Sequence, residues 1–189
     1  FKSFNEGVAR HSGNGGLEVL AKGAQQEGAN RANPVLFKTT SKVLSSYHEL
    51  SEEIFGPTSV VVEMNDSQDV VEAAKKLSGH FTATVHGTEK DLIDNKALLD
   101  ILEQKVGRVV INGFPTGVEV CHAMVHGGPY PSTTDGRSTS VGTAAIFRFT
   151  RAVCYQGMPQ SLLPAELKNE NPLGILRLVN GVRTTEQVK

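Results

Sequence analysis

An α/β fold built around a parallel sheet is predicted by the alternation of strand-like and helix-like segments between residues 58 and 112. β-Branched or alternating apolar runs indicate strands, and apolar residues on one helical face indicate the helices between them. The expected order is strand 59–62, a helix from Asp66 or Ser67 that ends at Gly79, strand 81–85, a long helix from Leu92 to Val106, and strand 108–112. Helices between strands make crossover connections, which join parallel neighbours, whereas antiparallel neighbours need only a tight turn.

The segments before this unit are less regular. Phe1, Phe4 and Val8 recur at helical spacing, so a helix is expected over residues 1–10. The stretch 22–33 is rich in Gly, Gln and Asn and is expected to be a loop, and residues 35–37 are expected to form a buried strand.

After the last expected strand, the periodicity stops. A long loop rich in Gly, Pro, Ser and Thr is expected from Gly113 to about residue 142, and loops of this length usually bind something. Strand-like patterns return at residues 145–150 and 174–179. The chain is therefore expected to divide into residues 1–144 and residues 145–189.

Composition excludes several classes of protein. A net charge of −1 with mixed acidic and basic residues argues against nucleic-acid and membrane-surface partners. No apolar run is long enough to span a membrane, and no secretion signal begins the chain, so a cytoplasmic location is expected. Cys121 and Cys154 are the only cysteines and are expected to be free thiols. The first residue is Phe and not Met, which hints at a start further upstream.

The most specific short string, EEIFGP at residues 52–57, stands just before strand 59–62. An acidic residue, an aromatic ring and a Gly-Pro turn could present a carboxylate to ribose hydroxyls while the ring packs on a flat heterocycle. Taken alone, the string fits better as a solvated helix end with a core Phe.

Taken with other motifs, the string resembles the signature of the aldehyde dehydrogenase superfamily. Residues 53–57 (EIFGP) match its nicotinamide-ribose motif, residues 107–113 (GRVVING) its Gly-x-Val-x-x-Asn strand, and residues 125–128 (VHGG) its Pro-Phe-Gly-Gly motif in an altered form. That alteration, with GVEVCH at 117–122 and VCYQ at 153–156, resembles the branch of α-ketoglutaric semialdehyde dehydrogenases and bacterial NADP-dependent fatty-aldehyde dehydrogenases.

The resemblance implies a parent enzyme that oxidises an aldehyde to a carboxylic acid through a cysteine thioester, with NAD or NADP as hydride acceptor. It implies cofactor-binding roles for Glu53 at the ribose and Phe55 beside the nicotinamide, and a substrate tunnel bordered by Val120, Cys121 and His126. In the family the nucleophile and the glutamate base precede the matched region. Residues 1–144 would then be part of the catalytic domain, without catalytic residues of their own.

The residues around Cys121 are compatible with two other kinds of chemistry, nucleophilic catalysis and zinc binding. His122 follows it and could serve as the base that a nucleophilic thiol needs, although the matched position favours a lining or packing role. Cys121, His122 and His126 also have spacing that invites a zinc site, but no convincing fourth ligand follows, so no metal is expected.

The sequence is therefore consistent with two functions. One is a piece of an aldehyde dehydrogenase that is inactive alone, and the other is a non-catalytic binding or assembly module with the same fold. The family resemblance further implies a homodimer or homotetramer, joined through a strand at residues 147–156 in the tail region 145–189. An exposed apolar patch around Phe1, Phe4 and Val35 would favour the first function.

Overall fold

The computed structural model describes residues 2–25, 28 and 31–188. It divides into two compact units, Phe1–Phe149 and Thr150–Lys189, and each is described by itself. The division expected from the sequence, between residues 144 and 145, falls inside the first of them. None of the helices in the described ranges is both long and apolar enough to cross a membrane.

The first sheet has the order β1-β2-β3. β2 (Val35–Thr40) and β3 (Thr58–Glu63) are parallel, and β1 (Glu18–Lys22) runs antiparallel to β2. The sequence predicted β2 from its apolar run. It did not predict β1, because the residues of β1 are mostly exposed and lack an alternating pattern. The core lies on β2, where the Phe37 side chain is fully buried beside Leu17 and Val35.

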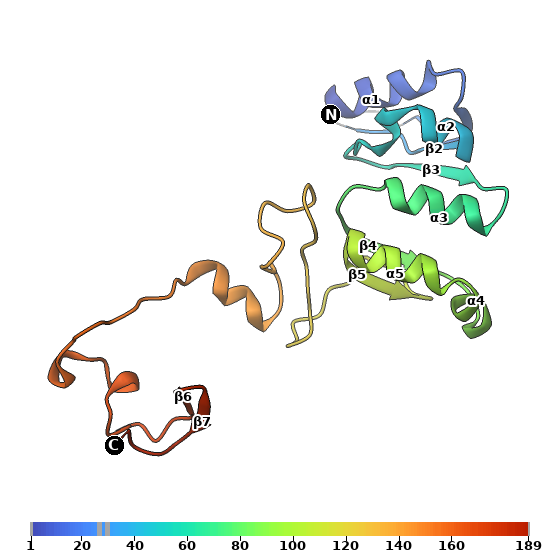
Figure 1. Cartoon of the computed structure of the whole chain (residues 1–189). Coiled ribbons are helices and arrows are strands. Elements are labelled where there is room, and N and C mark those ends of the chain that lie inside the picture. The colour runs from blue at the N-terminus through green and yellow to red at the C-terminus, as the bar shows by residue number, and fades with distance from the viewer. Residues whose placement is uncertain (1, 26–27, 29–30, 189) are drawn as a thin grey trace. The chain divides into compact units, whose positions relative to one another are not determined.

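Three helices and a 3-10 turn surround this sheet (Figure 1). They are α1 (Lys2–Ser12), α2 (Ser41–Ser46), η1 (His48–Ser51) and α3 (Ser67–Lys76). The expected start of α3 is confirmed, since the Asp66 carboxylate accepts a hydrogen bond of 2.9 Å from the Asp69 amide. The expected helix at the beginning of the chain is also present as α1.

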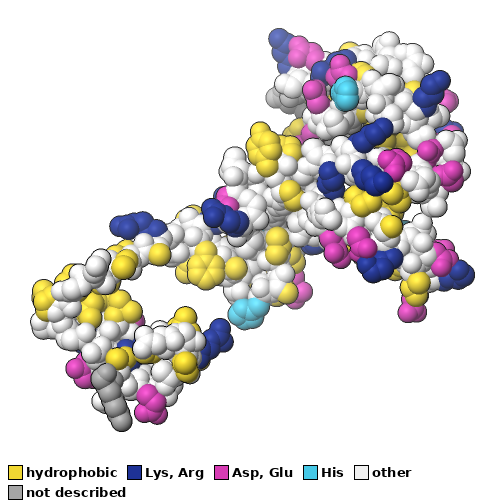
Figure 2. Space-filling model, in the orientation of Figure 1, with side chains coloured by type: hydrophobic (Ala, Val, Ile, Leu, Met, Phe, Trp, Pro, Cys, Tyr) yellow, Lys and Arg dark blue, Asp and Glu magenta, His cyan; other side chains and the backbone are white. Residues whose placement is uncertain are grey.

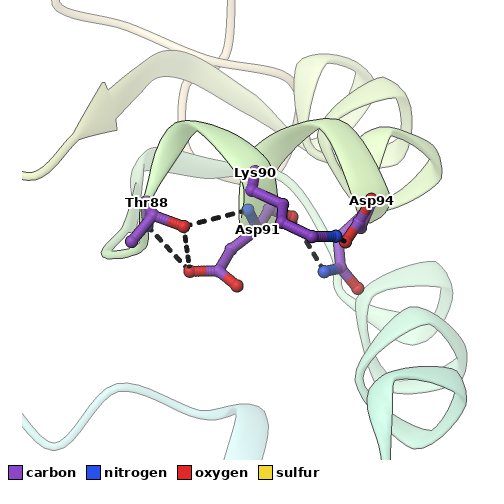
Figure 3. Close-up of polar contacts among 5 residues, drawn as sticks. Thr88, Lys90, Asp91 and Asp94 are labelled. Carbon is purple, nitrogen blue, oxygen red and sulfur yellow. Dashed lines mark hydrogen bonds and ion pairs between the residues drawn. The ribbon is translucent and has the colours of Figure 1, made fainter.

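The second sheet pairs β4 (His80–Val85) with β5 (Val106–Ile111) in parallel. The prediction of one long helix between them is wrong. Two separate helices, α4 (Glu89–Asp94) and α5 (Lys96–Lys105), lie there instead. Asn95 interrupts them with a non-helical backbone and donates its side-chain amide to the Asp91 carbonyl. α4 begins with a capping box, in which Thr88 and Asp91 bond each other's backbone amides (Figure 3).

The α/β class with parallel strand pairs is confirmed, but the three expected crossover strands do not form one continuous ladder. β3 pairs with β2, and β4 with β5, so the described strands form separate sheets. α3 and α5, which follow β3 and precede β5, pack against each other (Figure 1).

The expected long loop after β5 is confirmed, because residues 112–142 contain no helix or strand. The expected strand at residues 145–150 is wrong, since η2 (Thr143–Phe149) is a 3-10 helix and residues 150–155 are irregular. A strand needs a neighbouring strand to take its backbone hydrogen bonds. Here the Ala145 amide bonds to the local carbonyl of Gly142 instead.

The second unit contains two short 3-10 turns, η3 (Gln160–Leu162) and η4 (Ala165–Leu167), followed by a hairpin of β6 (Arg177–Val179) and β7 (Val182–Thr184). Asn180 and Gly181 form the hairpin turn with positive φ angles of 50° and 83°. The buried Asn171 amide donates to the carbonyls of Ile175 and Thr185 and so ties this unit together. The strand expected at residues 174–179 corresponds to β6.

Candidate cofactor and substrate site

Helix α1 fixes the direction in which the loop at residues 52–57 faces. A Cβ atom on Gly7 would lie 3.0 Å from Ile54 Cγ1, and one on Gly56 would lie 2.3 Å from Phe4 Cδ2. Ile54 and Gly56 are therefore packed against α1. The residues that alternate with them, Glu53 and Phe55, are left exposed, and the Phe55 side chain is 88% exposed.

Glu53 and Phe55 line a common cavity of about 580 Å³, together with His11, Leu50 and Val60 among others. This volume lies within the range of roughly 300–1,000 Å³ that small-molecule and cofactor sites occupy. The structure thus brings the two predicted cofactor residues to one cavity. The solvated-helix-end interpretation is correct for the exposure of the carboxylates and wrong for Phe55, which is not a core residue.

The two adjacent carboxylates of this loop differ in their partners. Glu52 Oε2 lies 3.5 Å from Arg10 Nη1 on α1, and both side chains are exposed. Within the described part of the chain, Glu53 forms no ion pair. An ionised carboxylate is a hydrogen-bond acceptor only, so Glu53 is available to hydroxyl donors at the cavity.

His11 is a cavity residue that the sequence reasoning missed. Its ring is 3% exposed, Nδ1 lies 3.3 Å from the Tyr47 hydroxyl, and it meets Phe37 edge to face. Burial, with the nearby Arg10 charge adding to it, lowers the pKa of His11 below its usual range, and the carboxylates of Glu49 and Glu52 oppose this. The burial of His11 could have been predicted from the sequence, because His11 is two helical turns after Phe4 and so lies on the same buried face of α1.

The three predicted tunnel residues lie on the long loop after β5, and only one of them is linked to the Glu53 cavity. The His126 ring stacks on Phe81 with 5.4 Å between ring centroids. Phe81 in turn lines a second cavity of about 550 Å³ that also includes Glu53. Val120 is 75% exposed and Cys121 is partly buried, and neither lines the two cavities at Glu53.

A close backbone approach places His126 at this position. A Cβ atom on Gly107 would lie 2.0 Å from the Gly127 carbonyl oxygen, so β5 and the segment after His126 are in direct contact. Both glycines belong to motifs that carried the family resemblance. Their spatial meeting could not be predicted from the sequence, because it depends on how the long loop returns to the sheet.

Among the residues with a described placement, neither thiol is hydrogen-bonded to a base. His122 Nδ1 lies 2.9 Å from the Thr143 hydroxyl, so this ring nitrogen is paired with Thr143 and not with Cys121. Cys154 is exposed in the second unit. Among the residues that the structure describes, no three His, Cys, Asp or Glu side chains are grouped so that they could hold a metal ion.

Solved structures with this fold include a dehydrogenase bound with NAD. The Delta-pyrroline-5-carboxylate dehydrogenase from Mycobacterium tuberculosis bound with NAD aligns at a TM-score of 0.57 and 16% identity, over 86% of this chain and 30% of that chain. The same enzyme bound with NAD and cobalamin aligns at a TM-score of 0.56 and 15% identity, over 86% of this chain and 31% of that chain. The fold is therefore that of a portion of such a dehydrogenase.

Sequence relatives give the family. No protein-family model matches the chain. Alpha-ketoglutaric semialdehyde dehydrogenase from Acinetobacter baylyi is 49% identical over 184 residues, which is 97% of this chain and 35% of that protein. Alpha-ketoglutaric semialdehyde dehydrogenase 2 from Azospirillum brasilense is 42% identical over 166 residues, which is 88% of this chain and 32% of that protein. The chain belongs to the aldehyde dehydrogenase superfamily, and it spans about a third of the length of these relatives.

Proposed function

We propose that this chain provides the nicotinamide-ribose end of the cofactor site in an NAD(P)-dependent aldehyde dehydrogenase that oxidises an aldehyde to a carboxylic acid. The observation that carries the proposal is the pair of Glu53 and Phe55 at one cavity. An acceptor-only carboxylate without an ion pair among the described residues stands beside an aromatic ring that is 88% exposed. Large exposed aromatic rings beside a cavity commonly mark a binding site.

The residues present fit a nicotinamide nucleotide. Glu53 can accept hydrogen bonds from both hydroxyls of a ribose, and the face of Phe55 can pack on the flat nicotinamide ring. The contacts of Ile54 and Gly56 with α1 hold these side chains outward before a ligand arrives, which reduces the entropy lost on binding. When bound, NAD or NADP would supply the hydride acceptor for aldehyde oxidation.

We further propose α-ketoglutaric semialdehyde as the substrate of the whole protein, with fatty aldehydes as the alternative. The identities of 49% and 42% to enzymes named for that semialdehyde support the first choice. On this proposal Val120, Cys121 and His126 border the aldehyde tunnel. A comparison of kcat/KM for the semialdehyde and for a long-chain aldehyde tests the choice, and a preference for the long-chain aldehyde would overturn it.

The role of Glu53 is tested in the whole protein by Glu53→Gln. The amide keeps the shape but loses the charge and one acceptor oxygen, so we expect the KM for NAD(P)+ to rise about 10-fold, which corresponds to about one charge-assisted hydrogen bond. The matched control is Glu52→Gln, which removes the exposed ion pair with Arg10 and should change that KM less than about 2-fold. Equal effects of the two substitutions would refute a specific role for Glu53.

The 189-residue chain by itself is proposed to be inactive. The superfamily's nucleophile lies outside the matched region, and neither Cys121 nor Cys154 has a base within the described residues. Purified alone, the chain should reduce no NAD(P)+ in the presence of aldehyde, whereas the whole protein should. Turnover by the isolated chain would overturn this part of the proposal.

A further inference from the structure

A further cavity is lined by residues of α2, η1 and α3. The two helices α2 and α3 pack against each other, and the cavity beside them has a volume of about 310 Å³. This volume is at the lower end of the range of roughly 300–1,000 Å³ that small-molecule sites occupy. The cavity shares only Ser51 with the two cavities at Glu53, and no residue of the long loop after β5 lines it. It is therefore a separate candidate site, here called the α2–α3 cavity.

Four partly buried side chains give the α2–α3 cavity an apolar wall. They are Leu44 on α2, Tyr47 between α2 and η1, Ala73 on α3, and Leu77 directly after α3. The Tyr47 hydroxyl lies 3.3 Å from His11 Nδ1, so its oxygen already has a partner and its ring is the part that can contact an apolar ligand. An aliphatic chain placed against this wall would remove further apolar surface from water, which favours binding.

The other four lining residues are polar, and none of them is acidic. They are Ser45, His48, Ser51 and Lys76, and all four are exposed, whereas the apolar four are partly buried. Lys76 Nζ on α3 donates a hydrogen bond of 3.2 Å to Ser45 Oγ on α2. The polar groups therefore lie at the solvent side of the cavity, with an ammonium group among them.

The charges around the α2–α3 cavity favour an anion. Glu72, one turn before Lys76 on α3, is bonded to Lys75 at 2.7 Å, and Lys76 forms no ion pair within the described ranges. An ammonium group has three donors, so two of those on Lys76 remain for a ligand. The Leu77 carbonyl at the end of α3 would repel an anion, but it accepts a hydrogen bond of 2.7 Å from Lys105 Nζ.

We propose that the α2–α3 cavity binds a small aliphatic monocarboxylate, with the carboxylate at Lys76 and the chain against the apolar wall. A hydrogen bond between an ammonium group and a carboxylate is among the strong ones, and Ser45 can donate to the second oxygen. The small volume limits the chain to a short one. This inference does not depend on the proposed function, because it uses none of the residues of the cofactor site.

Hydrogen–deuterium exchange of the whole protein tests the site, with octanoate as the probe. Octanoate should slow exchange about 3-fold or more in peptides covering residues 44–51 and 70–77, with a dissociation constant of about 1 mM or below, as expected for so small a ligand. No slowing in these peptides, or slowing only elsewhere, would overturn the site. This includes the case in which another part of the whole protein already fills the cavity.

Substitutions separate the role of Lys76 from that of general charge. Lys76→Gln should raise the dissociation constant of octanoate about 10-fold, and Lys76→Arg should keep it within about 3-fold. The matched control is Lys42→Gln, which removes the same charge from an exposed residue of α2 that does not line the cavity and should change the constant less than about 2-fold. Equal losses in Lys76→Gln and Lys42→Gln would overturn the assignment.

Two further probes test the chemistry of the ligand. Octanamide has the same chain without the charge and should bind about 10-fold more weakly than octanoate. Inorganic phosphate has the charge without the chain and should not slow exchange in these peptides. Equal affinities for octanoate and octanamide would overturn the carboxylate, and equal slowing by phosphate would overturn the apolar wall.

Discussion

At the scale of single residues, two glycines decide the direction in which the side chains proposed to bind the cofactor point. Gly7 leaves room for Ile54, and Gly56 leaves room for the Phe4 ring, so that the loop lies close against α1. Glu53 and Phe55 then face the cavity because their neighbours face the helix. The string EIFGP could be recognised from the sequence, but its orientation depends on Gly7, which stands far from it in the chain.

Gly7→Leu should destabilise the protein by about 1–3 kcal/mol, because Gly7 is buried and the new side chain must displace the partly buried Ile54. Urea unfolding measures the change. Ala9→Leu, on the exposed face of the same helix, is the matched control and should change the free energy of unfolding by less than about 0.5 kcal/mol. Equal stabilities of the two variants would contradict the close packing of α1 on Ile54.

His11 should make stability depend on pH near neutrality. Because burial lowers the pKa of His11 in the folded state below the value of about 6.5 in the unfolded chain, the unfolded state takes up the proton first as the pH falls. The His11 contribution is therefore complete above about pH 7 and is lost as the pH falls through 6.5 towards the folded pKa. Urea unfolding between pH 7.5 and 5 should show a steeper loss for wild type than for His11→Gln. Parallel curves would count against this assignment.

At the scale of helices and strands, local signals predicted elements well where neighbouring residues alone decide the outcome. The cap at Asp66 and the alternating pattern of β4 are examples. Two predictions failed, one through a local hydrogen bond and one where a strand would have needed a partner strand. Asn95 broke the expected long helix by bonding back to Asp91, and the expected strand near Phe147 formed a 3-10 helix.

Asn112 joins the ends of β4 and β5, and its replacement should weaken that connection. Its side chain donates to the Gly87 carbonyl at 2.8 Å and accepts from the Gly87 amide at 2.9 Å, and its φ of 51° suits few residues other than Asn and Gly. Asn112→Ala should lower the free energy of unfolding by about 1–3 kcal/mol. Asn112→Gly, which relieves the backbone but not the lost bonds, should lower it less. Equal losses would mean that the backbone conformation contributes nothing.

At the scale of the whole molecule, the apolar surface is distributed differently from the sequence expectation. Phe4 and Val35 are each 6% exposed, so these two residues do not form the exposed patch that would have favoured the fragment, and Phe1 lies outside the described residues. Large apolar side chains are instead exposed at positions such as Phe55, Phe114 and Phe149, and Figure 2 shows apolar side chains on the visible face of the molecule. Exposed apolar side chains in such number are typical of surfaces that bind a partner or another part of a protein.

We expect the whole protein to be a homodimer or homotetramer that pairs through residues 147–156. Residues 150–156 lie outside any helix or strand here and could gain strand hydrogen bonds from a second copy. Val153, which is 55% exposed, lies in this segment. Val153→Lys should reduce the mass of the assembly measured by light scattering. The control Val182→Lys, at a residue 65% exposed on β7, should leave it unchanged. An unaltered mass for both variants would exclude this segment as the interface.

The sequence by itself determined the α/β class, the cap at Asp66, the strands β2 to β5, and the motif residues Glu53 and Phe55, because these depend on side-chain periodicity and on strings of adjacent residues. The tertiary structure alone decided which strands pair, where α1 packs, and how Gly107 and Gly127 bring His126 beside Phe81. It also revealed that Arg108 donates hydrogen bonds to the carbonyls of Pro115 and Gly117, and such backbone acceptors leave no mark in the sequence. Contacts between distant residues depend on how loops return to the sheets, and periodicity carries no information about that path.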